Sequence, residues 1–239
     1  MAGRGYRNML VCGSSGSGKS HWVDKELLPA MTGRYRHMVI INTTEELSSH
    51  CAHREYVGEE QQKVAYSRDA VADLIRFHKT VHFEVAPGEN CLSFLEVLGE
   101  ALWTLGEYNT DFTEVLVVFD ETHLFLPKRA MPKAFARLET EGRKFGFDLV
   151  KITQTLQSPT GDTLSHLAIK QVNVLVVFNM SDFNDRKRIQ GLFPDLPDPS
   201  TFARPDDGGL PEYAVRDSKR GKTMVIRRDG MGGRVAVAA

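Results

Sequence analysis

The chain has 239 residues, 41% of them hydrophobic and 26% charged, and a formal net charge of −1. These values are typical of a globular domain with a full core, and they exclude a largely disordered chain. The near-zero net charge excludes a global basic field for nucleic acid, so any DNA contact has to be local. No apolar run approaches the ~20 residues of a membrane span, which predicts a cytoplasmic protein without a membrane span of its own. Three widely spaced cysteines, Cys12, Cys51 and Cys91, fit free thiols in a reducing compartment.

A glycine-rich segment near the N-terminus follows the apolar run Met9-Leu10-Val11-Cys12 and matches G-x-x-x-x-G-K-S, the P-loop pattern, at every position: Gly13-Ser14-Ser15-Gly16-Ser17-Gly18-Lys19-Ser20. Its glycines let consecutive N–H groups turn inward at the start of a helix, where they bind phosphate oxygens. We therefore expect Gly13 to His21 to bind the phosphates of ATP. Lys19 is expected to reach the β and γ phosphates, and Ser20 to hold Mg²⁺.

The first half of the chain alternates strands with helices. The expected elements are a strand over Arg7–Cys12, a helix over Lys19–Leu28 stopped by Pro29, a strand over Arg36–Asn42, a polar irregular segment over Glu45–Arg68, a helix over Arg68–Lys79 with Ser67 as its N-cap, a strand over Thr80–Val85 and a helix over Cys91–Tyr108. This alternation predicts a mainly parallel sheet with helices on both faces.

A second informative segment is the strand expected over Glu114–Phe119, whose apolar run is followed directly by Asp120 and Glu121. A run this apolar is typical of a strand buried on both faces, and α/β sheets bind ligands at the carboxyl ends of their strands. Taken alone, two acids here could be an ordinary turn. Beside a P-loop they have separate expected roles, Asp120 in the Mg²⁺ shell and Glu121 as the base for the attacking water.

The remaining elements continue the pattern and then change character. We expect a helix over Pro132–Phe145, a strand over Phe147–Thr153 ending in Gln154, a short helix within Ser158–Ile169, a strand over Gln171–Asn179, a helix over Ser181–Gly191 capped by Ser181, a loop over Phe193–Pro211, a two-stranded ribbon of Glu212–Val215 with Thr223–Arg227, and a loose tail over Asp229–Ala239. The predicted fold is an α/β P-loop NTPase core over residues 1–192, with a C-terminal loop, ribbon and tail over 193–239 that belong to the same domain.

Two local clusters of basic residues could contact DNA phosphates. They lie within Lys128–Lys144 and Arg216–Arg228 and hold six basic residues each. Solvated surfaces have the same composition, so each cluster alone favours the surface interpretation. Lys128, Arg129 and Lys133, next to Asp120 and Glu121, are the predicted DNA-facing residues.

The segments FDETHLFLP and LETEGRKFGFDLVKITQ resemble the HerA/FtsK superfamily of P-loop DNA-translocating ATPases, and the HerA branch most. Thr122 departs from the pattern, in which alanine is commoner. The resemblance implies a RecA-like fold, Lys19 and Ser20 in Walker A, and Asp120 and Glu121 in Walker B. It also implies that Gln154 is a polar sensor on the strand between the two Walker strands. Arg143 would be an arginine finger that acts on the nucleotide of a neighbouring subunit.

A bare ATPase core of this size is similar to the genome-packaging ATPases of icosahedral viruses with an internal membrane. The resemblance therefore implies a homo-oligomeric ring, expected to be a hexamer, that moves double-stranded DNA without sequence preference into a preformed capsid. Its partner would be a capsid or capsid-membrane protein at a portal vertex, in the host cytoplasm or on the virion. Three alternatives stay open: a cellular HerA-like helicase or conjugation motor, a secretion or morphogenesis ATPase that moves protein, and a module that binds ATP without turnover.

Overall fold

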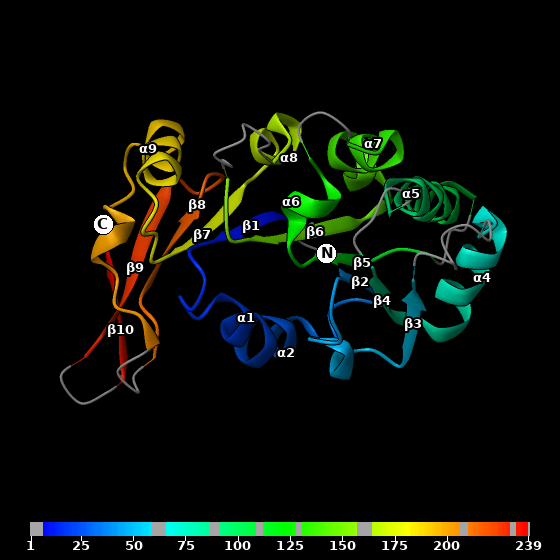
Figure 1. Cartoon of the computed structure of the whole chain (residues 1–239), viewed down its shortest axis with the longest axis horizontal. Helices are drawn as coiled ribbons and strands as arrows, with labels where there is room; N and C mark the ends of the chain where they lie inside the picture. The colour runs from blue at the N-terminus through cyan, green and yellow to red at the C-terminus, as the bar shows by residue number, and fades with distance from the viewer. Residues whose placement is uncertain are drawn as a thin grey trace.

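The computed structural model describes residues 7–58, 66–86, 91–108, 112–127, 131–156, 164–205, 210–229 and 233–238. In these ranges a single ten-stranded sheet runs across the molecule in the order β10-β9-β8-β7-β1-β6-β5-β2-β4-β3 (Figure 1).

Seven neighbouring strands of this sheet are parallel, as the alternation of strands and helices predicts. They are β1 (Asn8–Cys12), β2 (His37–Asn42), β3 (His53–Val57), β4 (Thr80–Val85), β5 (Val115–Phe119), β6 (Phe147–Thr153) and β7 (Val174–Phe178). Because β6 pairs with both β1 and β5, the strand that Gln154 directly follows lies between the two Walker strands. The P-loop, the two acids and Gln154 therefore come after three adjacent strands and lie at the carboxyl ends of these strands.

The three remaining strands are antiparallel and extend the sheet beyond β7. They are β8 (Tyr213–Asp217), β9 (Lys222–Arg228) and β10 (Arg234–Ala238). The predicted ribbon of β8 and β9 is confirmed. The prediction of a loose tail is wrong for Arg234–Ala238, because this segment pairs with β9 over its whole length.

Helices cover both faces of the sheet, as predicted. They are α1 (Lys19–Trp22), α2 (Leu28–Met31), α4 (Arg68–His78), α5 (Cys91–Tyr108), α6 (Thr122–Phe125), α7 (Lys133–Glu141), α8 (His166–Lys170) and α9 (Phe183–Leu192), with shorter 3₁₀ turns at Ser48–His50, Gly142–Phe145 and Pro199–Thr201. Across the described ranges, no helix is both long enough and apolar enough to cross a bilayer.

Alternate residues of the buried strands point to two separate cores. On β1, Leu10 belongs to a large core under the helices from α4 to α9, and Val11 belongs to a smaller core under α1 and α2. Figure 1 shows the corresponding layers, with α1 and α2 below the sheet and α5, α7 and α8 above it. Both cores reach the same edge of the sheet, so the segments that follow β1, β5 and β6 have rigid supports.

The polar segment expected to be irregular over Glu45–Arg68 contains β3, which forms one edge of the sheet. Its residues alternate between half-buried and exposed and only Val57 is fully buried, so the strand has no apolar run that could reveal it. Ser67 caps α4 as predicted, because its hydroxyl accepts a hydrogen bond from Ala70 N at 3.1 Å.

Two predicted helix boundaries are wrong. Pro29 does not stop the first helix, because a π-helical turn over Val23–Leu27 shifts the hydrogen-bond register and the helix continues as α2 to Met31. The N-cap of α9 is Asp182 rather than Ser181, since its carboxylate accepts from Asp185 N at 2.9 Å.

Candidate nucleotide site

The P-loop directly follows β1 and turns beside the carboxyl end of β7. Ser14 N donates to Asn179 O at 2.8 Å, which fixes the loop to that strand end. A Cβ atom on Gly13 would come within 2.7 Å of Phe178 Cβ, so only glycine allows this approach. Gly18 has a left-handed φ of +92°, which favours glycine at the start of α1. The glycine positions of the motif are thus explained by the turn itself.

Lys19 lies at the beginning of α1 with its side chain folded back over the loop. Its Nζ donates to Ser14 O at 2.9 Å, and the residue is buried. Burial lowers the pKa of Lys19, while the negative charge of Glu121 opposes this shift. The ammonium group is thus held at the position where phosphate oxygens would enter the loop.

The two acids at the end of β5 take different environments. Asp120 is buried, and its carboxylate accepts from Glu121 N at 3.0 Å and from Asn42 Nδ2 at 3.3 Å. Burial, and then repulsion by Glu121, raise the pKa of Asp120 to about 6. A buried carboxylate with a raised pKa is one that a cation would stabilise.

Glu121 adopts a left-handed φ of +53°, a strained conformation for a residue with a side chain. Its Oε1 accepts a hydrogen bond from Gln154 Nε2. Its Oε2 lies 3.4 Å from His123 Nδ1. This second oxygen is buried and accepts no hydrogen bond from any described residue. The carboxylate is therefore oriented by Gln154 through one oxygen, while the other oxygen faces His123.

His123 contacts a hydroxyl group as well as the carboxylate. Thr153 Oγ1 lies 3.3 Å from His123 Nδ1 and donates its proton to Thr155 O at 2.7 Å. Because that hydroxyl proton is already used, His123 Nδ1 has to be the donor in this contact. A protonated Nδ1 then faces Thr153 and Glu121 together.

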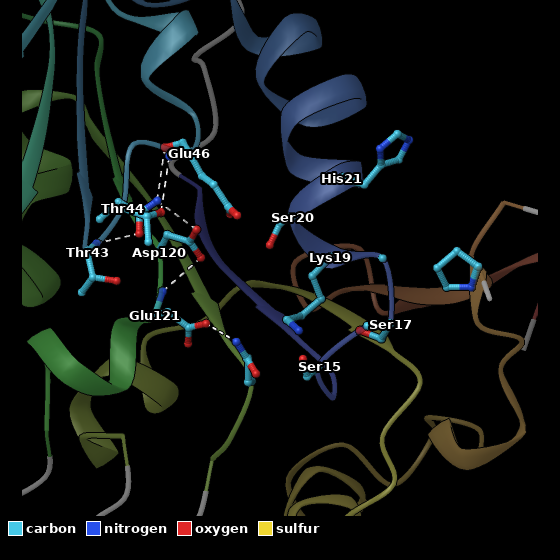
Figure 2. Close-up of a pocket in the computed structure, with 15 residues that line it drawn as sticks. Ser15, Ser17, Lys19, Ser20, His21, Thr43, Thr44, Glu46, Asp120 and Glu121 are labelled. Atoms are coloured by element: carbon cyan, nitrogen blue, oxygen red, sulfur yellow. Dashed lines mark hydrogen bonds between the residues drawn. The ribbon is translucent and has the colours of Figure 1, made fainter.

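Lys19, Asp120, Glu121 and Gln154 line one cavity of about 540 Å³. Figure 2 shows the hydroxyl of Ser20 and the carboxylates of Asp120 and Glu46 pointing into the same part of it. Oxygen ligands of this kind are those that Mg²⁺ prefers. The raised pKa of Asp120 shows that its ionised carboxylate is destabilised there, and a bound cation would stabilise it. The residues present therefore fit a magnesium ion held by Ser20 and Asp120, with Glu46 beside it.

Seven of the nine residues predicted to bind nucleotide line this cavity: Ser15, Gly16, Ser17, Gly18, Lys19, Ser20 and His21. Gly13 and Ser14 belong to the loop but do not line it. The Ser14 side chain faces the other way, where its Oγ lies 2.9 Å from Ser181 Oγ and accepts from Ser181 N at 2.8 Å. These two residues support the loop rather than line it.

Arg143 lies apart from all the other predicted site residues. It is exposed in the 3₁₀ turn Gly142–Phe145, which precedes β6, whereas the cavity lies beyond the carboxyl ends of the strands. Within the described chain no hydrogen bond or ion pair of its side chain is present. Arg143 thus lies at the amino ends of the parallel strands, and the cavity lies at their carboxyl ends.

Sequence reasoning missed six residues that belong to the site: Asn42, Thr43, Thr44, Glu46 and Pro205, which line the cavity, and His123, which lies beside Glu121. Asn42 ends β2, the neighbour of β5, and a polar residue at that position was an available signal. Pro205 comes from the C-terminal loop, and its Cγ would lie 3.6 Å from a Cβ atom on Gly18. Nothing in the sequence near Pro205 indicates this contact.

In the C-terminal basic cluster, the arginines of the ribbon are paired within the chain. In the C-terminal cluster, Arg216 pairs with Asp195 at 2.8 Å and Arg227 pairs with Glu212 at 3.3 Å. In the other cluster, Lys133 begins α7, while Lys128 and Arg129 lie outside the described residues. The arginines of the ribbon thus have structural partners.

A strand, a glycine loop and a helix that together face an acidic pair on a nearby parallel strand define the fold of a P-loop NTPase. No model of a protein family and no curated protein matches the sequence. The fold is nevertheless shared with solved structures of P-loop ATPases. The genome packaging NTPase B204 from Sulfolobus turreted icosahedral virus 2, in complex with ATP-gammaS, has a TM-score of 0.66 and 16% identity over 93% of this chain and 98% of that chain.

Two further similar structures come from bacteria. VirB4 of Thermoanaerobacter pseudethanolicus has a TM-score of 0.63 and 11% identity over 95% of this chain and 91% of that chain. EccC of Thermomonospora curvata (ATPases 2 and 3), in complex with a signal sequence peptide, has a TM-score of 0.51 and 13% identity over 97% of this chain and 36% of that chain. At these identities the comparisons establish the fold, and they agree with the resemblance found in the sequence.

Proposed function

We propose that this chain is an Mg²⁺-dependent ATPase that moves double-stranded DNA through a ring of identical subunits, and that it packages a viral genome into a preformed capsid. The observation that carries the ATPase is the Glu121 carboxylate. One of its oxygens accepts a hydrogen bond from Gln154 and the other accepts none from the described residues, and the residue lines a cavity that Lys19 and Ser20 also line. A module that only binds ATP would have no need for this carboxylate.

The proposed chemistry gives a separate role to each predicted side chain that lines the cavity. Glu121 takes a proton from water, the water oxygen bonds to the γ-phosphorus, and the bond from that phosphorus to the β,γ-bridging oxygen breaks to release ADP. Lys19 and the N–H groups of the loop stabilise the charge on the phosphate oxygens. Magnesium, held by Ser20 and Asp120, would supply further neutralisation when bound. Gln154 orients Glu121 through the hydrogen bond to Oε1.

The position of Arg143 supports the proposal of a ring. Because this side chain lies at the edge of the sheet opposite the cavity, we propose that it completes the site of the next subunit. Such a contact joins two different surfaces head to tail, which closes into a ring when the rotation between subunits allows it. Hydrolysis would then depend on assembly, since the guanidinium comes from a neighbour.

Double-stranded DNA is the proposed cargo because a genome packaging NTPase shares this fold over nearly its entire length. DNA contact would be mainly to phosphates, with Lys133 among the residues involved, and would weaken as salt rises. A capsid or capsid-membrane protein would hold the ring at a portal vertex in the host cytoplasm.

The test is the steady-state ATPase rate with and without long double-stranded DNA. We would compare wild type, Glu121→Gln, Arg143→Ala, an equal mixture of these two variants, and Lys144→Ala. Lys144 is the matched control, because it is an exposed cation next to Arg143 that pairs with Glu141 at 2.6 Å. We expect DNA to stimulate wild type, both single variants to be inactive, the mixture to regain activity, and Lys144→Ala to stay within about twofold of wild type.

Three outcomes would contradict parts of this proposal. An active Glu121→Gln would remove the proposed base. An inactive mixture, with both variants folded, would remove the shared site. No stimulation by DNA, together with an inactive Glu121→Gln, would leave an ATPase with another cargo.

That last outcome would favour a second candidate, an ATPase that moves protein. The observation in its favour is that EccC, solved with a signal sequence peptide, shares this fold. Stimulation by an unfolded polypeptide instead of by DNA would identify it.

A further inference from the structure

An open groove lies between α8 and α9, away from the nucleotide site. Its volume is about 770 Å³, against about 540 Å³ for the nucleotide cavity, and no described residue lines both. Apolar side chains of Ile169, Val172, Leu192 and Phe193 line it. Leu192 is 49% exposed, although the other three are buried. The groove is therefore an apolar surface that is open to solvent.

The described charged residues that line this groove all have the same sign. Lys170, Lys187 and Arg188 line it together with His166, and no described acidic residue does. Arg188 is already engaged, because its guanidinium donates to Leu156 O at 2.9 Å. Lys170 and Lys187 are exposed and form no ion pair with any described residue. A ligand with negative charges beside apolar groups would satisfy both parts of the groove.

Gly191 is one of the residues that line the groove. It lies in the last turn of α9, and a Cβ atom placed on it would meet no atom within 4 Å. Neither a left-handed φ nor close packing requires glycine here, and glycine inside a helix costs roughly 0.5–1 kcal/mol relative to alanine. Because Gly191 lines the groove, a bulky side chain at this position would occupy open space at the border of the groove.

We propose that this groove, lined by α8 and α9, docks an amphipathic segment of a partner protein, with apolar side chains on the groove floor and Asp or Glu side chains beside Lys170 and Lys187. Its volume suits two or three apolar side chains. Docking of an apolar helix face into a groove is a common mode of peptide recognition. DNA fits this surface less well, because most DNA contacts of proteins go to phosphate and sugar and an apolar floor offers no partner for them.

The groove is connected to the nucleotide site through α9. Near the start of this helix, Asp185 is buried and accepts hydrogen bonds from Leu156 N at 3.0 Å and from Thr155 Oγ1 at 3.2 Å. These two residues directly follow Gln154. A partner bound at the far end of α9 therefore rests on the helix that supports the segment beyond Gln154. The docking proposal itself does not depend on hydrolysis, so it can be tested without nucleotide.

The experiment measures fluorescence anisotropy of a labelled helical peptide with leucine at i, i+3, i+4 and i+7 and glutamate elsewhere. It uses the full chain without nucleotide. A matched peptide carries lysine in place of glutamate, and a second carries serine in place of leucine. We expect the acidic amphipathic peptide to bind at least about tenfold more tightly than either control peptide.

Variants of the chain place the binding in the groove. Gly191→Trp should weaken binding at least about tenfold by filling the space, while Gly191→Ala should change it less than about twofold. The double variant Lys170→Glu and Lys187→Glu should lose the preference for glutamate. Lys222→Glu, an exposed charge change on β9, should leave it unaltered. Circular dichroism melting curves would confirm that each variant is folded.

Four results would overturn the proposal. The acidic peptide binds no more tightly than its controls, or Gly191→Trp binds it as well as wild type does. The double lysine variant loses affinity for a DNA duplex but not for the peptide, which would assign the surface to DNA. Gly191→Trp dissociates an oligomer of the wild-type chain in sedimentation velocity, which would assign the groove to a second copy.

Discussion

Lys151 is a charged residue in the middle of β6, a strand that is buried along its whole length. It is fully buried, and its Nζ lies 2.8 and 3.0 Å from the two carboxylate oxygens of Glu139 on α7. Asn8 Nδ2 donates to the same carboxylate at 2.6 Å. The pair joins the sheet to α7, the helix that leads to Arg143.

Removing one partner of this pair should be far more damaging than removing both. We expect Lys151→Met to lower the free energy of unfolding by about 3–5 kcal/mol, because Glu139 would stay buried without a counter-charge. The double variant Lys151→Met and Glu139→Leu should recover most of that loss. Urea denaturation measures both values.

Lys25→Met is the control for this comparison, because its ion pair with Asp24 is exposed and should contribute less than about 1 kcal/mol. If Lys151→Met and Lys25→Met had equal effects, the buried pair would not be important for stability.

Asp120 should make the metal-free protein less stable at neutral pH. Its pKa is raised from 3.8 to about 6, so between these values the folded protein binds more protons than the unfolded chain, and stability falls as pH rises. Above pH 6 the ionised carboxylate is retained at a cost. We expect Asp120→Asn to raise the free energy of unfolding by about 1–3 kcal/mol at pH 7.5 in EDTA, while abolishing ATPase activity.

Thermal denaturation at two pH values checks this expectation. At pH 4 wild-type Asp120 is largely protonated, so wild type and Asp120→Asn should melt at similar temperatures. A variant that is less stable than wild type at pH 7.5 would show that the carboxylate is stabilised by its neighbours rather than strained by them.

At the level of elements, the contacts of Thr122 explain why threonine stands at a position where alanine is commoner in the sequence pattern. It is fully buried, and its hydroxyl lies 2.8 Å from Ile152 O on β6 and 3.2 Å from Phe119 O on β5. The hydroxyl thus connects the ends of the two strands that carry Asp120 and Gln154.

We expect Thr122→Ala to lower the free energy of unfolding by about 1–2 kcal/mol, because a buried hydrogen bond to the strand ends is lost. Thr140→Ala is the control: its hydroxyl bonds Ala136 O at 3.1 Å on the exposed side of α7, and its loss should change stability by less than about 0.5 kcal/mol. Equal changes in the two variants, measured by urea denaturation, would contradict this role for Thr122.

The elements that could be predicted from the sequence are those with a continuous signal. The strand over Phe147–Thr153 and the helix over Cys91–Tyr108 were predicted with the bounds that the structure has, because apolar runs and helical spacing are local properties. The edge strands β3 and β10 were missed: β3 has no apolar run because an edge strand buries little, and β10 lies in a segment rich in glycine and alanine that is typical of a loose tail. The π-helical turn before Pro29 was missed because proline normally ends a helix.

The site divides in the same way. Lys19, Ser20, Asp120 and Glu121, which all line the cavity, could be predicted because each motif is contiguous in sequence and its chemistry dictates the residue types. Residues such as Glu46 and Pro205 reach the cavity only through the fold, from loops far from either motif. The opposite position of Arg143 could not be seen from the sequence, because it depends on which edge of the sheet each loop occupies.

At the scale of the whole molecule, the sheet is long and open, and its two ends differ. At the β3 end, charged and aromatic side chains cover the edge, with Arg54 contacting Glu84 and Glu45. At the other end, β10 pairs with β9 alone among the described strands, and its residues after Arg234 carry no charge. Val235 and Val237 are both nearly half exposed.

This second end determines how the protein should behave in concentrated solution. An edge strand with exposed valines and no charge after Arg234 is a template for pairing with other chains, so we expect slow aggregation of the wild type during storage. Val235→Lys should reduce the rate of increase in light scattering at high protein concentration by severalfold without changing the melting temperature. Lys222→Glu, which already sits on a charged part of β9, should have no such effect. The same edge that completes the sheet would thus set the practical solubility of the protein.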